Sequence, residues 1–196
     1  MESERNELYP VFLKVHQFPT LIIGGGNVGF EKLGFLLKSS PNANVTMVAE
    51  HFLDELEELA SKHQVPLLQR SYSEELLDNF QLIIVATDDQ ELNRNIHADC
   101  KKRKILVNVA DQPEYCDFYM GGIVTKGHLK LAISTNGKSP TGAKRLRQFF
   151  EQILPEELES LLLNLNAYRS TIKGDFEQKV NKLNDLTKEF LDRPSD

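Results

Sequence analysis

The chain of 196 residues carries a formal net charge of −6, with 40% hydrophobic and 27% charged residues, a composition typical of ordinary soluble globular proteins. It holds no apolar run near the roughly 20 residues that a membrane helix needs, and its polar, acidic start is unlike a signal peptide. We therefore expect a cytoplasmic protein with no membrane association. The acidic balance also argues against a nucleic-acid partner, because phosphate contacts ordinarily require a basic surface.

Two apolar segments open the chain. Leu8–Val15 predicts a short strand or an extended arm, and Thr20–Ile23 predicts the first strand of a sheet. That strand breaks abruptly into glycines and is followed by a helical pattern over about Val28–Lys38. A strand, a tight turn and a helix in this order begin a βαβ unit.

The glycines that follow the first strand have a defined spacing. Gly24, Gly26 and Gly29 match G-x-G-x-x-G, in which the first glycine permits the turn, the second lets the backbone approach a pyrophosphate, and the third lets the helix lie close to the sheet. Asn27 and Val28 begin the helix, whose N-terminus attracts phosphate. The motif predicts a dinucleotide site, and the alternative is a structural turn in an unrelated α/β protein.

Strand and helix patterns alternate after this turn. Further strands are predicted at Val45–Ala49, Val65–Arg70, Phe80–Ala86 and Ile105–Ala110, and helices near Phe52, at Ser73–Leu77 and at Gln90–Arg103. Pro66 cannot donate to a strand ladder and indicates an edge position for its strand. The fold class predicted is α/β, a Rossmann-type doubly wound parallel sheet ordered 3-2-1-4-5.

Polar residues follow several of these strands at the carboxyl edge, where this fold opens its ligand crevice. Glu50 follows the second strand, where an acid often binds the ribose hydroxyls of NAD; alternatively it caps the next helix. Thr87 and Asp88 follow the fourth strand, where they lie beside the cofactor, cap the helix from Gln90, or do both. Asp111 follows the fifth strand at the same edge.

The pattern changes after Pro113. Phe118–Val124 and His128–Ser134 flank a glycine turn and predict a β-hairpin. Because a lone hairpin is marginally stable, we expect it to extend the sheet or to pair with another subunit. A polar loop and a helix that starts at Pro140 come next.

The C-terminal part is predicted to be helical. Its apolar residues, to which we assign packing roles, form two stripes: Leu158, Leu161, Leu162 and Leu165, then Phe176, Val180, Leu183, Leu186 and Phe190. The expected division is an NAD-binding Rossmann domain (1–113), a hairpin and dimerisation segment (114–144) and a helical C-terminal domain (145–196). Cys100 and Cys116 are interpreted as buried or incidental thiols, and the absence of a His/Cys cluster argues against a permanent metal site.

Four stretches together resemble one known family. They are Tyr9–Leu13, Gly24–Gly29, Ala86–Asn93 with Val107–Asp111, and Cys116–Phe118 leading to Ala132–Pro140. Over roughly residues 8–150 the chain resembles the precorrin-2 dehydrogenases of siroheme synthesis, the N-terminal module of siroheme synthases. One departure is Tyr119–Gly122, which replaces the Phe-Pro-type sequence common after the Cys-Asp-Phe motif of that family.

The resemblance implies NAD-dependent oxidation of the tetrapyrrole precorrin-2 to sirohydrochlorin by a homodimer. It implies a catalytic role for Asp111, as the acceptor of a substrate proton, and places Ser134 and Thr135 in the substrate region, with Lys138 among the cations for the substrate carboxylates. Glu50 would repel a 2′-phosphate, which favours NAD over NADP. The chain is too short for the methyltransferase domain of the fused enzymes.

Two other functions stay open on the sequence. Some members of the family also insert iron into sirohydrochlorin, so a bifunctional dehydrogenase and ferrochelatase is one alternative. The other is a non-catalytic NAD-sensing module.

Overall fold

The computed structural model describes residues 5–188, which form two compact units. The first comprises residues 5–121 and 134–140, and the second comprises residues 122–133 and 141–188. The division at 113/114 and 144/145 stays a prediction. Phe190 of the second predicted stripe lies outside the described residues.

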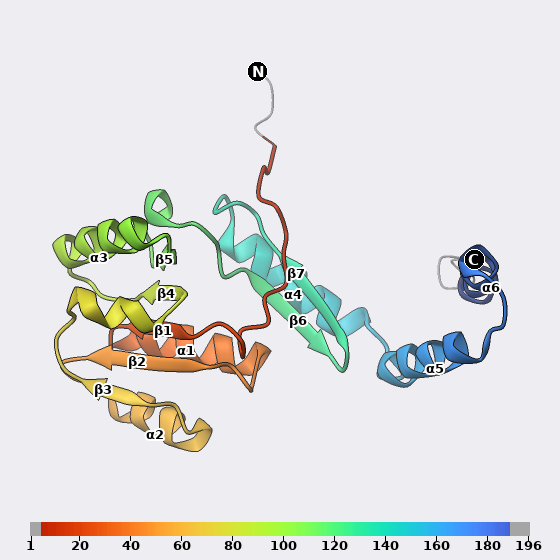
Figure 1. The fold of residues 1–196 in the computed structure, drawn as a ribbon, viewed down its shortest axis with the longest axis horizontal. Coiled ribbons are helices and arrows are strands. Elements are labelled where there is room, and N and C mark those ends of the chain that lie inside the picture. The colour runs from red at the N-terminus through yellow and green to blue at the C-terminus, as the bar shows by residue number, and fades with distance from the viewer. Residues whose placement is uncertain (1–4, 189–196) are drawn as a thin grey trace. The chain divides into compact units, whose positions relative to one another are not determined.

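A five-stranded parallel sheet forms the centre of the first unit (Figure 1). Its order is β3-β2-β1-β4-β5, which confirms the predicted doubly wound arrangement with the proline-preceded strand at an edge. The strands are β1 (Thr20–Ile23), β2 (Val45–Ala49), β3 (Leu67–Gln69), β4 (Leu82–Val85) and β5 (Leu106–Val109). Every residue of β1 and β4 is buried, because helices cover both faces of a parallel sheet.

Successive side chains of β1 point to opposite faces and feed two apolar clusters. Ile22 packs in the cluster that contains Leu33, whereas Leu21 and Ile23 pack in the cluster that contains Ile96. The first cluster also contains side chains from α1 (Asn27–Ser39) and α2 (Asp54–His63). The second contains side chains from α3 (Gln90–Arg103) and the 3₁₀ helix η1 (Glu74–Asn79). A second 3₁₀ helix, η2 (Pro113–Tyr115), follows β5.

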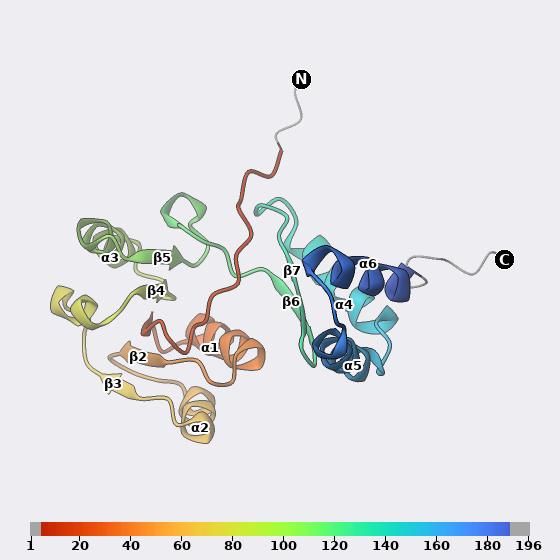
Figure 2. The same ribbon diagram turned by 45° about the vertical axis from the view of Figure 1, so that its right-hand side comes forward.

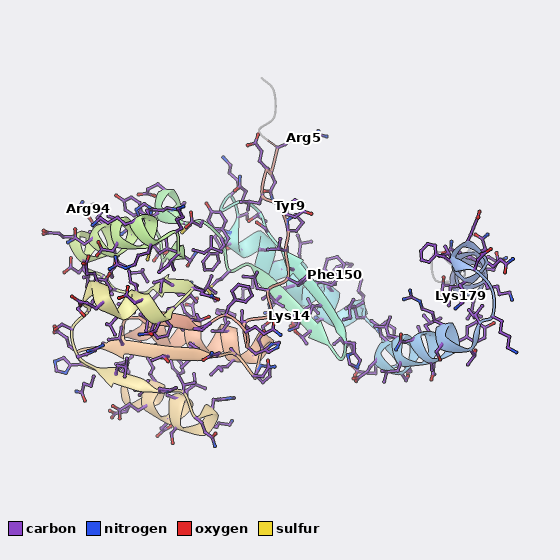
Figure 3. All side chains as sticks on the ribbon, viewed as in Figure 1. Arg5, Tyr9, Lys14, Arg94, Phe150 and Lys179 are labelled. Atoms are coloured by element: carbon purple, nitrogen blue, oxygen red, sulfur yellow. The ribbon has the colours of Figure 1, made fainter. Side chains whose placement is uncertain are left out.

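The segment before the sheet is an extended arm and not a strand. Residues 5–14 have no regular secondary structure, and Figure 3 labels Tyr9 among their side chains. Tyr9 is 87% exposed and Phe12 66% exposed. Pro10 lacks a backbone N–H and so cannot donate to a strand ladder. Of the two alternatives predicted for this segment, the extended arm is confirmed and the strand is wrong.

The second unit begins with an antiparallel hairpin, β6 (Gly122–Lys126) and β7 (Leu129–Ile133), with Gly127 at φ +53° in its turn. The hairpin is confirmed, but it forms a two-stranded sheet of its own, so the expectation that it extends the main sheet is wrong. One face is occupied by α4 (Pro140–Ile153), which lies alongside it (Figure 2). A Cβ on Gly122 would lie 3.3 Å from the carbonyl oxygen of Ala143. β6 starts at Gly122, later than predicted, and Phe118 and Met120 before it pack on an apolar cluster of the first unit.

Two further helices, α5 (Leu158–Thr171) and α6 (Phe176–Thr187), complete the described chain. Neither contains a fully buried residue. Phe176 is 77% exposed and Leu186 is 55% exposed. The predicted helices are therefore confirmed. The packing role predicted for these two side chains is wrong for a single copy of the chain, because no described element covers them.

Candidate active site

The glycine corner between β1 and α1 is held by two glycines and left open at a third. Gly24 has φ +127°, and a Cβ there would lie 2.3 Å from the carbonyl oxygen of Ala86. A Cβ on Gly29 would lie 2.2 Å from the carbonyl oxygen of Gly24. A Cβ on Gly26 would meet nothing within 4 Å. Gly24 and Gly29 thus fix the turn and the close approach of α1, while Gly26 leaves space in front of the helix.

The N-terminus of α1 is suited to an anion. Gly26 is its N-cap, no side chain among the described residues bonds to the first N–H groups, and no acidic residue lies in the first turn. Asn27 and Val28 are exposed at its start. Open space in front of uncapped N–H groups and a helix dipole suits a pyrophosphate, so the residues of this corner fit a dinucleotide.

Glu50 lies directly after β2 with an exposed side chain. Its Oε1 accepts a hydrogen bond from the Ser71 hydroxyl at 2.6 Å. α2 begins instead with Leu53 as its N-cap and no side-chain hydrogen bond. The alternative that Glu50 caps this helix is therefore wrong.

The end of β4 contains a hydrogen-bonded threonine and an exposed acid. Asp89, rather than Thr87 or Asp88, caps α3, since its carboxylate accepts from the N–H groups of Glu91 and Leu92. The Thr87 hydroxyl donates to Oδ1 of Asn93 at 2.6 Å. Asp88 stays exposed at the sheet edge.

Asn93 is a residue that the sequence analysis missed. It is 1% exposed, and its amide donates back to the carbonyl oxygen of Thr87 at 3.2 Å. The signal was a polar residue on the face of α3 that also carries Ile96 and Cys100. Its two bonds hold Thr87 in one orientation.

Asp111 follows β5 in a left-handed backbone conformation, φ +59°. The strand end is fixed by the N–H of Ala110, which donates to the carbonyl oxygen of Val85 at 2.9 Å. The side chain is exposed, and among residues 5–188 its carboxylate makes no hydrogen bond or ion pair. Because the carboxyl ends of parallel strands share one edge of the sheet, Asp111 is an unengaged carboxylate on the edge that carries the glycine corner.

The Cys-Asp-Phe motif closes the outer edge of β5. The Asp117 carboxylate accepts from the N–H of Val107 at 3.1 Å and pairs with Lys101, while the Asp117 N–H donates to the Val107 carbonyl at 2.8 Å. The Cys116 thiol bonds to the N–H and the carbonyl of Val109, and burial raises its pKa. These contacts give the motif a structural role.

The polar loop between β7 and α4 is shaped by its own side chains and belongs to the same compact unit as the glycine corner. Ser134 Oγ accepts from the N–H of Asn136, and Thr135 Oγ1 accepts from the N–H of Ser139, both at 3.2 Å. The backbone N–H of Lys138 donates to the Thr135 carbonyl at 3.0 Å. The two hydroxyl groups thus help to hold the turn.

Two cations of the second unit have acidic partners within that unit. Lys126 pairs with Glu156 at 2.8 Å, and Arg147 pairs with Glu151 at 2.5 Å. Within the described residues, no group of three or more His, Cys, Asp or Glu side chains is arranged to hold a metal ion. No helix of the same range is long and apolar enough to cross a membrane.

The sheet order and the open glycine corner define a Rossmann-type dinucleotide-binding protein. Residues 11–122 match a family model described as NAD(P)-binding, and residues 126–153 match one described as sirohaem biosynthesis protein central. The chain belongs to this NAD(P)-binding family, with the siroheme-biosynthesis segment following it.

Individual relatives agree with this assignment. The siroheme synthase of Pseudoalteromonas translucida is 36% identical over 173 residues, which cover 88% of this chain and 36% of the relative. The siroheme synthase of a Psychrobacter species is 33% identical over 189 residues, covering 89% of this chain and 38% of the relative. The chain therefore spans well under half the length of these relatives.

A solved structure titled "SirC, precorrin-2 dehydrogenase" superposes with a TM-score of 0.72 at 26% identity and covers 94% of this chain and 90% of that one. The resemblance to the precorrin-2 dehydrogenase and siroheme synthase N-terminal family is thereby confirmed.

Proposed function

We propose that this protein catalyses the NAD-dependent dehydrogenation of precorrin-2 to sirohydrochlorin, a step of siroheme biosynthesis. The observation that carries the proposal is an exposed, unengaged carboxylate, Asp111, on the sheet edge that carries the open glycine corner. Similarity to a precorrin-2 dehydrogenase over nearly the whole length of both chains supports the choice of substrate.

The reaction balances as precorrin-2 plus NAD⁺ giving sirohydrochlorin, NADH and a proton. When bound, NAD accepts the hydride. Gly26 and the N–H groups that start α1 would hold its pyrophosphate, and Thr87 and Asp88 would line the crevice beside it. The Asp111 carboxylate receives the proton that leaves the tetrapyrrole.

The preference for NAD over NADP rests on Glu50. Its carboxylate is exposed at the end of β2, and it would accept hydrogen bonds from ribose hydroxyls and repel a 2′-phosphate. Both cysteines are free, which suits the reducing cytoplasm where we place the reaction.

The substrate carries many carboxylates, so its site needs cations and hydrogen-bond donors. We assign this part to the loop of Ser134, Thr135 and Lys138.

We also propose a homodimer, supported by an apolar stripe on α4. Leu146, Phe149 and Ile153 follow helical spacing and are 46%, 52% and 53% exposed. A second copy that covered this stripe would bury these three side chains. Light scattering of the purified protein should give twice the chain mass, and a Phe149→Asp variant should give the mass of one chain.

The activity is tested by mixing the purified protein with precorrin-2 and NAD and following NADH absorbance together with the sirohydrochlorin spectrum. The proposal expects one NADH for each sirohydrochlorin formed. A folded protein that binds NAD and yields no NADH would point instead to an NAD-sensing module. A parallel sample of sirohydrochlorin with ferrous iron or cobalt tests the ferrochelatase alternative.

A further inference from the structure

The ends of β2 and β3 are joined by three hydrogen bonds around Glu50. The Ser71 hydroxyl donates to Oε1 of Glu50 at 2.6 Å. The Gln69 amide donates to the Glu50 carbonyl oxygen at 3.2 Å, and the Arg70 N–H donates to the Ala49 carbonyl oxygen at 2.9 Å. Both the backbone and the carboxylate of Glu50 are therefore held from the neighbouring strand.

The same segment touches the glycine corner. A Cβ on Gly25 would lie 2.0 Å from the carbonyl oxygen of His51 and 2.9 Å from Cβ of Ala49. The N–H of Leu53 donates to the carbonyl oxygen of Gly25 at 3.0 Å. Glu50 lies between Ala49 and His51, so its backbone is fixed directly beside the corner that fits a pyrophosphate.

We infer that Ser71 is a positioning residue for nucleotide selection: it orients the Glu50 carboxylate to bind the ribose hydroxyls of a dinucleotide that lacks a 2′-phosphate. The inference rests on the proposed function and adds a residue from β3 to it. Ser71 occupies one carboxylate oxygen, which leaves the other for the ribose. Without this bond, the exposed glutamate side chain samples several rotamers, and its charge is no longer fixed at the ribose.

Arg70 makes the selection sensitive to the charge of Glu50. Its side chain is exposed and, in the part of the chain that the structure describes, makes no hydrogen bond or ion pair. Arg70 directly precedes Ser71 in the chain, so this segment carries a positive charge that would attract a 2′-phosphate once the repulsion from Glu50 is removed. Removing the carboxylate charge should therefore turn the site from rejecting the phosphate to accepting it.

The test is a fluorescence titration of NADH and of NADPH into the full chain. The variants are Ser71→Ala, Ser71→Thr and Glu50→Gln, with Ser61→Ala, on the exposed side of α2, as the matched control. Losing one hydrogen bond to a carboxylate predicts that Ser71→Ala weakens NADH binding roughly tenfold or more and does not weaken NADPH binding. Ser71→Thr should restore the ratio, Ser61→Ala should not alter it, and Glu50→Gln should weaken NADH and strengthen NADPH.

The outcomes separate this inference from the proposed function. Equal weakening of both nucleotides by Ser71→Ala, or no change in either, overturns the positioning role while wild-type NADH binding and turnover stand. A wild type that binds neither nucleotide refutes the proposed function and this inference with it. If Ser71→Ala does not fold, Ser71→Cys, which keeps the size but donates weakly, decides between the same results.

Discussion

Replacing Gly26 by alanine should separate the fold of this protein from its nucleotide binding. Gly26 is the one glycine of the motif at which a Cβ meets nothing within 4 Å, and its backbone, at φ −89° and ψ −166°, is open to any residue. The new methyl group would stand in the space that we assign to the pyrophosphate. The Gly26→Ala variant should therefore be stable and bind NADH poorly.

The magnitudes follow from the surroundings of the residue. Alanine is a poorer N-cap than glycine by about 0.5–1 kcal/mol, and the loss of unfolded-chain entropy returns about 0.4–1 kcal/mol. The free energy of unfolding should thus change by less than about 1 kcal/mol. Losing even one hydrogen bond between an N–H and a phosphate, worth about 1.5–3 kcal/mol, weakens binding roughly tenfold or more.

Two neighbouring glycines provide the controls. Gly29→Ala places its Cβ 2.2 Å from a backbone oxygen and should destabilise the fold by about 1–3 kcal/mol or more. Gly34→Ala, whose nearest atom is 3.9 Å away on Leu59, should stabilise α1 by about 0.5–1 kcal/mol and leave binding intact. Urea denaturation and NADH titration measure both quantities. Wild-type NADH affinity in Gly26→Ala would refute this placement of the pyrophosphate.

Three further changes test other parts of the account. Asp111→Asn removes the carboxylate but keeps a side chain that tolerates a left-handed backbone. Turnover should fall at least about 100-fold while NAD affinity, measured by titration, stays unchanged. Equal losses of turnover and of NAD affinity would contradict its catalytic role. Asp117→Ala removes the acceptor for Val107 and the partner of Lys101, and urea denaturation should show a loss of about 1–3 kcal/mol; no loss would mean that the β5 edge is closed by other contacts. Burial raises the pKa of Cys100 from 9.0 to about 12, so the thiol ionises in the unfolded chain before it ionises in the folded one. Its contribution to stability is complete below the unfolded pKa and is lost as pH rises from about 9 toward 12. The stability difference between wild type and Cys100→Ala should therefore shrink as pH rises above about 9, and a constant difference would contradict the shift.

The sheet and the glycine corner were predictable because their signals are local. Continuous apolar runs mark β1 and β4 as buried strands, and the spacing of Gly24, Gly26 and Gly29 reports steric demands that arise within one turn of chain. The bounds of α3 were also predicted correctly, since Asp89 caps it and Lys104 ends it in a left-handed conformation.

Contacts across the sheet were not predictable in the same way. Ser71 meets Glu50 only because β3 lies parallel to β2, and Asp117 meets Val107 only because the chain turns back along β5. An apolar stripe in the sequence also predicts which face of a helix is apolar, but it does not identify the element that packs against that face. Phe176 fits a helical stripe and is still exposed.

The most direct measurement of the central claim is a single-turnover reaction with precorrin-2 and NAD, run side by side on wild type and Asp111→Asn. The account predicts that wild type releases one NADH per sirohydrochlorin and that the variant, saturated with NAD to the same extent, releases almost none. Equal NADH formation by the two proteins would contradict the claim that this carboxylate accepts the substrate proton.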